Sequence, residues 1–182
     1  MIPLVKDTIT NQEIDLLADW LRGHPRLTKG ELTLRFEDRW SELIGCKHSV
    51  FVNSGSSANL LMLYSLIESG KLYTGNKVIV PAVSWATDLA PVCQLGLIPI
   101  LCDCNLRDLS VDLSSLEDLM IKNKPKALML VSVLGLVPEM EKIVELCDKY
   151  GVILLEDTCE SIGSSYKERN LGTFGLMSSF ST

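Results

Sequence analysis

Short apolar runs alternate with segments of helical periodicity along most of the chain. Aliphatic and β-branched residues dominate five of these runs, at 49–52, 78–80, 98–101, 127–133 and 152–155. Helices are predicted at about 56–68, 87–95, 114–122 and 139–150, and an amphipathic helix is predicted ahead of them, between Gly30 and Gly45. Alternating strands and helices are typical of βαβ units, and near-continuous apolar strands favour a mostly parallel sheet covered on both faces. The sequence therefore predicts one α/β domain over residues 1–182, with three αβα layers.

Composition narrows the class of protein. Of the 182 residues, 47% are hydrophobic, which is enough for an apolar core without disulfide or metal links. The net charge of -6 comes with no basic block, so nucleic acid is not an expected partner. The longest mostly apolar run, 127–137, is far shorter than the roughly 20 residues that cross a bilayer, and Lys6 and Asp7 interrupt the first twelve residues too early for a secretory signal. We therefore expect no membrane association and a cytoplasmic location, where the six cysteines stay reduced.

In parallel sheets covered by helices, ligands bind beyond the carboxyl ends of the strands. The residues that follow the predicted strands are therefore the first place to look for chemistry, and we expect them to share one rim. These segments are 53–57, 81–85, Asp103, 132–135, 156–157 and 178–182.

Residues 53–59, NSGSSAN, form a turn of small residues between a predicted strand and a predicted helix. Gly55 permits a positive φ, and Ser56 and Ser57 would begin the helix, where free N–H groups attract an anion. The segment matches neither the Walker A motif nor G-x-G-x-x-G. It predicts either a phosphate site or an ordinary tight turn with a serine N-cap.

Two further candidates follow strands. Glu156 and Asp157 end the most hydrophobic predicted strand, 152–155. An acid at this place can pair with a metal, a ribose hydroxyl or a protonated heterocyclic nitrogen, or it can cap the next turn. Trp85 can stack on a cofactor or belong to the core. No metal site is predicted, because His24 and His48 fit no recognised ligand spacing.

Taken in order, these segments resemble the large domain of fold-type I pyridoxal-phosphate enzymes, and specifically the DegT/StrS family of nucleotide-sugar aminotransferases. The resemblance extends over almost the whole chain. The residues that carry it are Thr28 to Gly30 before the Phe36-Glu37 helix, Asn53 to Ala58, Val78 to Pro81 with Trp85, Gly96 and Pro99 leading to Asp103, Glu156-Asp157, and Gly172 to Ser181.

The resemblance implies pyridoxal 5'-phosphate (PLP) or pyridoxamine 5'-phosphate (PMP) as cofactor and a role for each candidate. The turn at Gly55 with Ser56 and Ser57 would bind the cofactor phosphate, and the Ser181 hydroxyl would bind the same group. Trp85 would stack on the pyridine ring, and Asp157 would pair with the pyridinium nitrogen. Glu160 occupies a place near the cofactor hydroxyl where the family more often has Gln, so its role is open.

Family members carry the cofactor as a Schiff base on a lysine, which the motif would place about four residues beyond Thr182. Lys167 lies in a polar loop before Phe180 and is not expected to take that role. We therefore expect the chain to be an N-terminal portion of such an enzyme, with little turnover by itself.

The resemblance leaves the reaction open. It implies amino transfer to a nucleotide-linked keto-sugar of deoxysugar or cell-surface polysaccharide biosynthesis, in a homodimer with active sites at the subunit interface. One branch of the family replaces the lysine with histidine and uses PMP to dehydrate a 4-keto-6-deoxy sugar at carbon 3. A noncatalytic fragment that binds cofactor or a partner subunit is the third alternative.

Overall fold

The computed structural model describes residues 8–182. Residues 1–7, most of the segment considered as a secretory signal, therefore lie outside the described residues. Within the part of the chain that is described, no helix combines the length and the apolar character that a membrane span requires.

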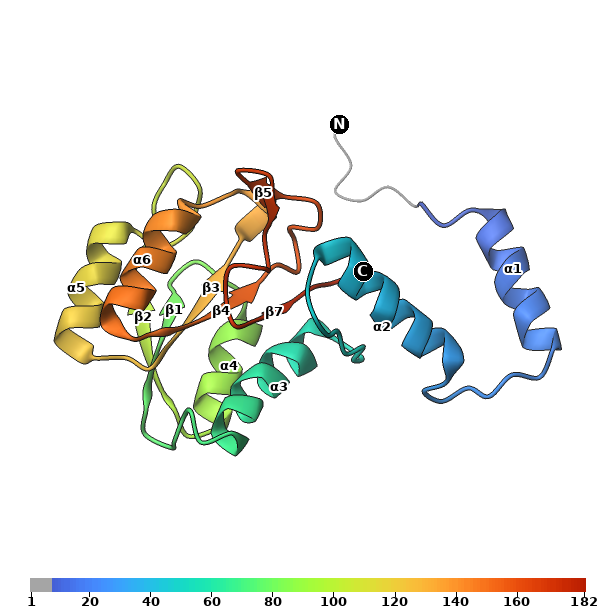
Figure 1. Ribbon diagram of the computed structural model, residues 1–182, viewed down its shortest axis with the longest axis horizontal. Helices are drawn as coiled ribbons and strands as arrows, with labels where there is room; N and C mark the ends of the chain where they lie inside the picture. Colours follow the sequence, from blue (N-terminus) through green and yellow to red (C-terminus); the bar gives the residue numbers. More distant parts are fainter. Residues whose placement is uncertain (1–7) are drawn as a thin grey trace.

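Five parallel strands form the central sheet (Figure 1). In spatial order they are β2 (Ile98–Cys102), β1 (Lys77–Pro81), β3 (Ala127–Val131), β4 (Ile153–Asp157) and β7 (Met177–Ser179). The register pairs Asp157 with Val131 on one side and with Ser179 on the other, so the carboxyl ends of these three strands are level. The predicted mostly parallel α/β fold is confirmed.

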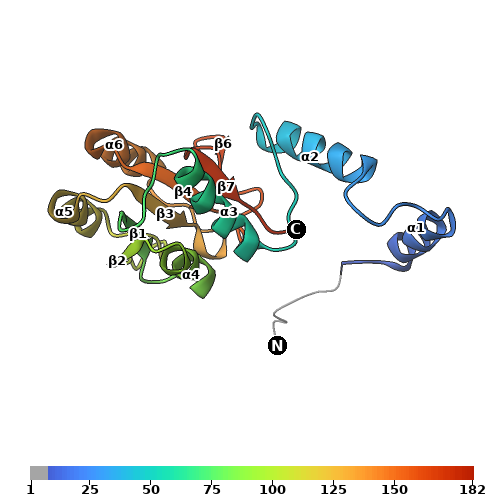
Figure 2. The ribbon, with the colours of Figure 1, turned by 90° about the horizontal axis from the view of Figure 1, so that it is seen from below.

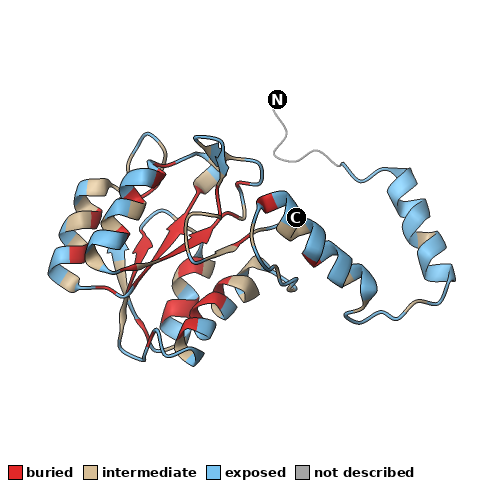
Figure 3. Ribbon diagram, in the orientation of Figure 1, coloured by how far each residue is buried: buried red, intermediate tan, exposed pale blue. Residues whose placement is uncertain are grey.

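Helices cover both faces of the sheet (Figure 2). Helices α3 (Gly55–Glu68) and α4 (Ala86–Gln94) lie on one face, and α5 (Leu113–Asn123) and α6 (Met140–Tyr150) lie on the other. Because successive strand residues point to opposite faces, Leu128 and Leu130 pack toward α5 and α6, whereas Met129 packs toward α3 and α4. The buried residues are concentrated in these strands and in the helix faces that cover them (Figure 3).

Two helices at the N-terminal end extend away from the sheet (Figures 1 and 2). Helix α2 (Glu31–Ile44) confirms the predicted amphipathic helix and ends at Gly45, which has a φ of 86°. Helix α1 (Asn11–Arg22) was not predicted, and none of its residues is buried. The capping box between Thr10 and Glu13 is the sequence signal that could have identified its start.

The first predicted strand, 49–52, is wrong. This segment pairs with no strand of the sheet, and its side chains Val50 and Phe51 are 72% and 54% exposed. Instead, the Phe51 N–H donates to Glu37 Oε1 at 2.9 Å, and its ring contacts Phe36 edge-on. The apolar pattern suits a strand, but the segment lies against α2 and is not part of the sheet.

Two short elements near the end of the chain were also not predicted. A hairpin of β5 (Ser165–Tyr166) and β6 (Arg169–Asn170) precedes the edge strand β7. Strand β7 has only three residues, too few to give a periodic apolar pattern. It places Ser179 beside the end of β4.

Candidate functional site

The centre of the candidate site is a pair of buried carboxyl groups joined by one amide. Asp157 ends β4, and Asp88 lies in the first turn of α4. The Asn59 side-chain nitrogen, from α3, donates to Asp157 Oδ2 at 2.6 Å and to Asp88 Oδ1 at 3.0 Å. Ser179 donates to the Asn59 Oδ1 at 2.7 Å, which fixes the amide so that its NH₂ group faces both acids.

Both acids are buried, and the burial changes the ionisation of Asp88. Asp88 is fully buried and Asp157 is 5% exposed. Burial raises the pKa of Asp88 to about 8, and the neighbouring Asp157 acts in the same direction. No ion pair among residues 8–182 involves either acid. Near neutral pH, Asp88 therefore retains its proton.

Trp85 is connected to this pair through the backbone. Its N–H donates to Asp88 Oδ2 at 3.2 Å at the start of α4. Its indole Nε1 donates to Glu160 Oε1 at 3.2 Å, and the Leu134 N–H donates to Glu160 Oε2 at 2.7 Å. Because Trp85 is 64% exposed, the alternative that it belongs to the core is wrong.

The start of α3 lies beside the loop that follows β4. Gly55 and Ser56 begin the helix, Ser54 is its N-cap, and the Ser54 Oγ accepts from the Ser57 N–H at 3.2 Å. The first amides of a helix have no intrahelical partner, so those of Gly55 and Ser56 remain available at this end. Ser56 is exposed and Ser57 is half-buried.

The expected positive φ at Gly55 is wrong, because this residue lies inside the helix and is not among the positive-φ glycines. A Cβ atom at Gly55 would lie 3.0 Å from Cys159 Sγ. The close approach of the loop after β4, and not the backbone conformation, therefore limits the size of this residue.

Glu156 does not belong to the site. It points to the opposite side from Asp157, where its carboxylate accepts from the N–H groups of Gly172, Phe174 and Gly175 at 2.6–2.8 Å. Burial raises the pKa of Glu156, and these three hydrogen bonds oppose the rise. The alternative that this acid satisfies a turn is the one the geometry supports.

The remaining candidates lie farther along the rim. Ser181 is exposed just beyond β7, and Ser179, two residues earlier, is the serine that reaches the acid pair. Asp103 accepts from the Cys104 N–H at 2.8 Å after β2. Lys167, in the β5–β6 hairpin, pairs with Glu141 at 2.6 Å. Over residues 8–182, no three His, Cys, Asp or Glu side chains are grouped to hold a metal.

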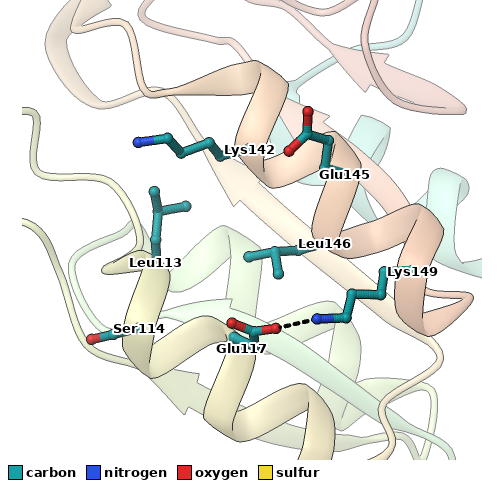
Figure 4. Close-up of a pocket in the computed structure, with 7 residues that line it drawn as sticks. All are labelled: Leu113, Ser114, Glu117, Lys142, Glu145, Leu146 and Lys149. Carbon is teal, nitrogen blue, oxygen red and sulfur yellow. Dashed lines mark hydrogen bonds and ion pairs between the residues drawn. The ribbon is translucent and has the colours of Figure 1, made fainter.

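A separate groove lies between α5 and α6 and has a volume of about 450 Å³ (Figure 4). Its lining includes Leu113, Leu146 and the ion pair between Glu117 and Lys149 at 2.7 Å. It contains none of the predicted site residues, so it is distinct from the rim.

Sequence reasoning found Asp157, Trp85, Glu160 and the start of α3, and the structure brings these residues to one edge of the sheet. It missed Asn59 and Asp88. An acid three residues after a helix N-cap is a recognisable first-turn signal, but it indicates a cap and not a buried partner for Asp157.

Residues 7–182 match the sequence profile of the DegT/DnrJ/EryC1/StrS aminotransferase family. The chain belongs to this family. It is 38% identical to the GDP-4-keto-6-deoxy-D-mannose 3-dehydratase of Escherichia coli O55:H7, over 99% of this chain and 46% of the relative. It is 30% identical to the GDP-perosamine synthase of Vibrio cholerae, over 100% of this chain and 48% of the relative. The chain thus spans about half the length of the curated relatives it matches.

Solved structures of this family share the fold. The Escherichia coli GDP-4-keto-6-deoxy-D-mannose-3-dehydratase with bound hydrated PLP superimposes with a TM-score of 0.91 at 35% identity, over 98% of this chain and 46% of that chain. A Streptococcus pneumoniae structure described as a sugar aminotransferase in its PMP form superimposes with a TM-score of 0.88 at 25% identity. The match covers 99% of this chain and 47% of that chain. These neighbours are fold-type I PLP enzymes, which confirms the predicted fold class.

Proposed function

We propose that this chain is the cofactor-binding large domain, spanning residues 1–182, of a PLP- or PMP-dependent enzyme that acts on a nucleotide-linked 4-keto-6-deoxy sugar. The observation that carries the proposal is a buried carboxylate, Asp157, with no cationic partner among the described residues, close to a helix start and an exposed indole. A protonated heterocyclic nitrogen would supply the missing positive charge.

The residues present fit the cofactor at three points. The amides of Gly55 and Ser56, followed by Ser57, offer the phosphate the positive end of α3. The exposed indole of Trp85 offers a flat face to a ring, and Asp157 offers a carboxylate to its nitrogen. Ser181 would add a hydroxyl to the phosphate site. When bound, PLP or PMP supplies an electron-accepting ring that stabilises negative charge on the neighbouring carbon.

Within this arrangement each side chain has a defined task. Asp157 holds the proton on the ring nitrogen, because an ionised partner favours the charged form of that nitrogen. Glu160 fixes the rotation of Trp85 by accepting its indole N–H. By the family resemblance, Glu160 would lie near the cofactor hydroxyl, at the place where the family more often has Gln.

For the reaction, we favour 3-dehydration over amino transfer. The chain is 38% and 36% identical to two GDP-4-keto-6-deoxy-D-mannose 3-dehydratases but 30% and 31% identical to two GDP-perosamine synthases. We also propose a cytoplasmic homodimer. Six free cysteines support the location, because a reducing compartment keeps thiols unpaired.

The test uses the protein expressed from its complete coding sequence, with PMP, glutamate and GDP-4-keto-6-deoxy-D-mannose. Dehydration would remove the oxygen at carbon 3 and release ammonia, whereas amino transfer would leave nitrogen on the sugar at carbon 4; NMR of the product distinguishes the two. A protein that binds neither PLP nor PMP would contradict the assignment as a whole.

Cofactor affinity tests the role of Asp157 directly. We expect Asp157→Asn to weaken PLP binding by roughly 10- to 100-fold, because a charged hydrogen bond of about 1.5–3 kcal/mol becomes a neutral one. Absorbance titration measures the dissociation constant. Asp118→Asn, an exposed substitution on α5, is the matched control and should leave it unchanged.

A further inference from the structure

The second acid of the site, Asp88, has no assigned task in the proposed function. Its position is nevertheless closely defined. Its Oδ1 accepts from Asn59, its Oδ2 accepts from the Trp85 N–H, and its side chain has no exposed surface. Asp88 thus contacts the residue that bridges to Asp157 and the backbone of the aromatic residue that would cover the ring.

The two carboxyl groups are so close that ionisation of one disfavours ionisation of the other. Both accept from the same Asn59 nitrogen, at 3.0 and 2.6 Å, which places their bonded oxygens within the range of about 4–6 Å where like charges disfavour joint ionisation. Asp157 has a second donor, the Cys159 N–H at 2.9 Å. The second oxygen of each acid therefore also accepts a hydrogen bond from one backbone N–H group.

Few other groups can influence the pair. The titratable groups that face Asp88 are Asp157 from β4 and the Cys159 thiol that follows it, whose pKa burial and Asp157 raise to about 12. Asn59 from α3 is neutral, and so is Ser179 from β7. No lysine, arginine or histidine among residues 8–182 forms an ion pair or hydrogen bond with either acid. A proton is the available positive charge in this part of the structure.

We propose that Asp88 and Asp157 form a single acid pair that holds one proton, on Asp88, and that Asp88 releases this proton when a cationic ring nitrogen binds Asp157. Asp88 is thus a positioning residue for the proposed cofactor site, and the inference rests on the proposed function. In the step, the O–H bond of Asp88 breaks and the proton passes to the solvent buffer. The bound cation then faces two carboxylates bridged by Asn59.

In the protein without cofactor, the acid pair should change how thermal stability depends on pH. The pKa of Asp88 is raised to about 8 in the folded state, so its proton favours folding below the unfolded-state value of about 4 and this contribution is lost as the pH rises through 8. Thermal stability should therefore fall between pH 5 and 9. Asp88→Asn has no ionisable group at this position, but its NH₂ group would face a donor where one Asp88 oxygen accepts, so its melting temperature should be lower than that of the unsubstituted protein near pH 4. Between pH 5 and 8.5, its melting temperature should fall by at least about 4 °C less than that of the unsubstituted protein.

The decisive measurement is calorimetric titration of the full-length protein with PLP in two buffers of different ionisation enthalpy. At pH 7 the unsubstituted protein should release up to one proton more than Asp88→Asn for each PLP bound. Its affinity should also rise by about fivefold or more, relative to Asp88→Asn, between pH 6.5 and 8.5. The groups of PLP itself titrate in both proteins, so the difference between them reports Asp88.

The outcomes separate the two proposals. PLP binding with equal proton release and equal pH dependence in both proteins would overturn the inference and leave the proposed function intact. Absence of PLP binding by the unsubstituted protein would overturn both. A melting temperature that does not fall with pH, in a protein that binds PLP, would show that Asp88 carries no proton. A purely structural role for Asp88 would change stability but not proton release.

Discussion

At the scale of single residues, two adjacent acids have opposite roles because a strand alternates its side chains. Asp157 points toward α3 and α4 and joins the acid pair, whereas Glu156 points away and binds the turn at 172–175. Both are buried at the end of β4, and composition alone does not separate them. The hydrogen-bond partners differ: Glu156 accepts from three backbone amides, while Asp157 accepts, among residues 8–182, from Asn59 and Cys159.

This difference predicts a stability effect without a binding effect. In Glu156→Gln the amide oxygen can still accept from Phe174 and Gly175, but the NH₂ group would face the Gly172 N–H, donor against donor. We expect a loss of about 1–3 kcal/mol in the free energy of unfolding, measured by urea denaturation. Asp118→Asn should change it little, and cofactor affinity at temperatures where the variant is folded should stay the same. A variant as stable as the parent would mean that Glu156 does not anchor the turn.

At the scale of elements, the pattern of apolar residues predicted four strands of the sheet and failed for the segment at 49–52. The strands at 78–80, 98–101, 127–133 and 152–155 appear within two residues of their predicted bounds, because helices cover both faces of the sheet that they form. The run at 49–52 has a similar composition but no neighbouring strand. Strand pairing is a long-range property, and local periodicity carries no information about the partner.

The candidate site could also be predicted only in part. The rim could be predicted because parallel strands end at one edge, so Asp157, Trp85 and the start of α3 were found together. Asn59 and Asp88 could not be predicted, since their roles depend on how α3 and α4 pack across the end of β4. Ser179 reaches the pair only because β7 adds to the edge of the sheet.

The turn into β7 also depends on one glycine. Gly172 has a φ of 85°, and a Cβ there would lie 2.3 Å from the Phe180 ring and 3.1 Å from Thr158 Oγ1. Gly75 has nearly the same φ, 84°, but has nothing within 4 Å of its Cβ position. We expect Gly75→Ala to cost about 1–2 kcal/mol from the backbone conformation alone. Gly172→Ala should cost about 1–3 kcal/mol more, because the added methyl overlaps its neighbours. Equal losses in urea denaturation would argue against tight packing at Gly172.

At the scale of the whole molecule, the apolar surface is unevenly distributed. The apolar cores lie between the sheet and its four covering helices, whereas α1 has no buried residue and extends from the body (Figures 1 and 3). Ile14, Leu17 and Leu21 lie on one face of α1, at helical spacing, and are 53%, 51% and 44% exposed. An apolar helix face of this kind is typical of a surface that is covered by another part of an assembly.

The exposure of α1 predicts that substitutions on its apolar face will change association and not folding. In the full-length protein, Leu17→Glu combined with Leu21→Glu places two carboxylates on that face, and burying them against a partner would be costly. If α1 contributes to the proposed homodimer, the double variant should dissociate at least about tenfold more readily. Analytical ultracentrifugation measures this change, and the melting temperature of the monomer should stay unaltered. Gln12→Glu adds charge on the opposite, polar face and should associate like the parent. A double variant that remains as associated as Gln12→Glu would exclude this face from the subunit interface.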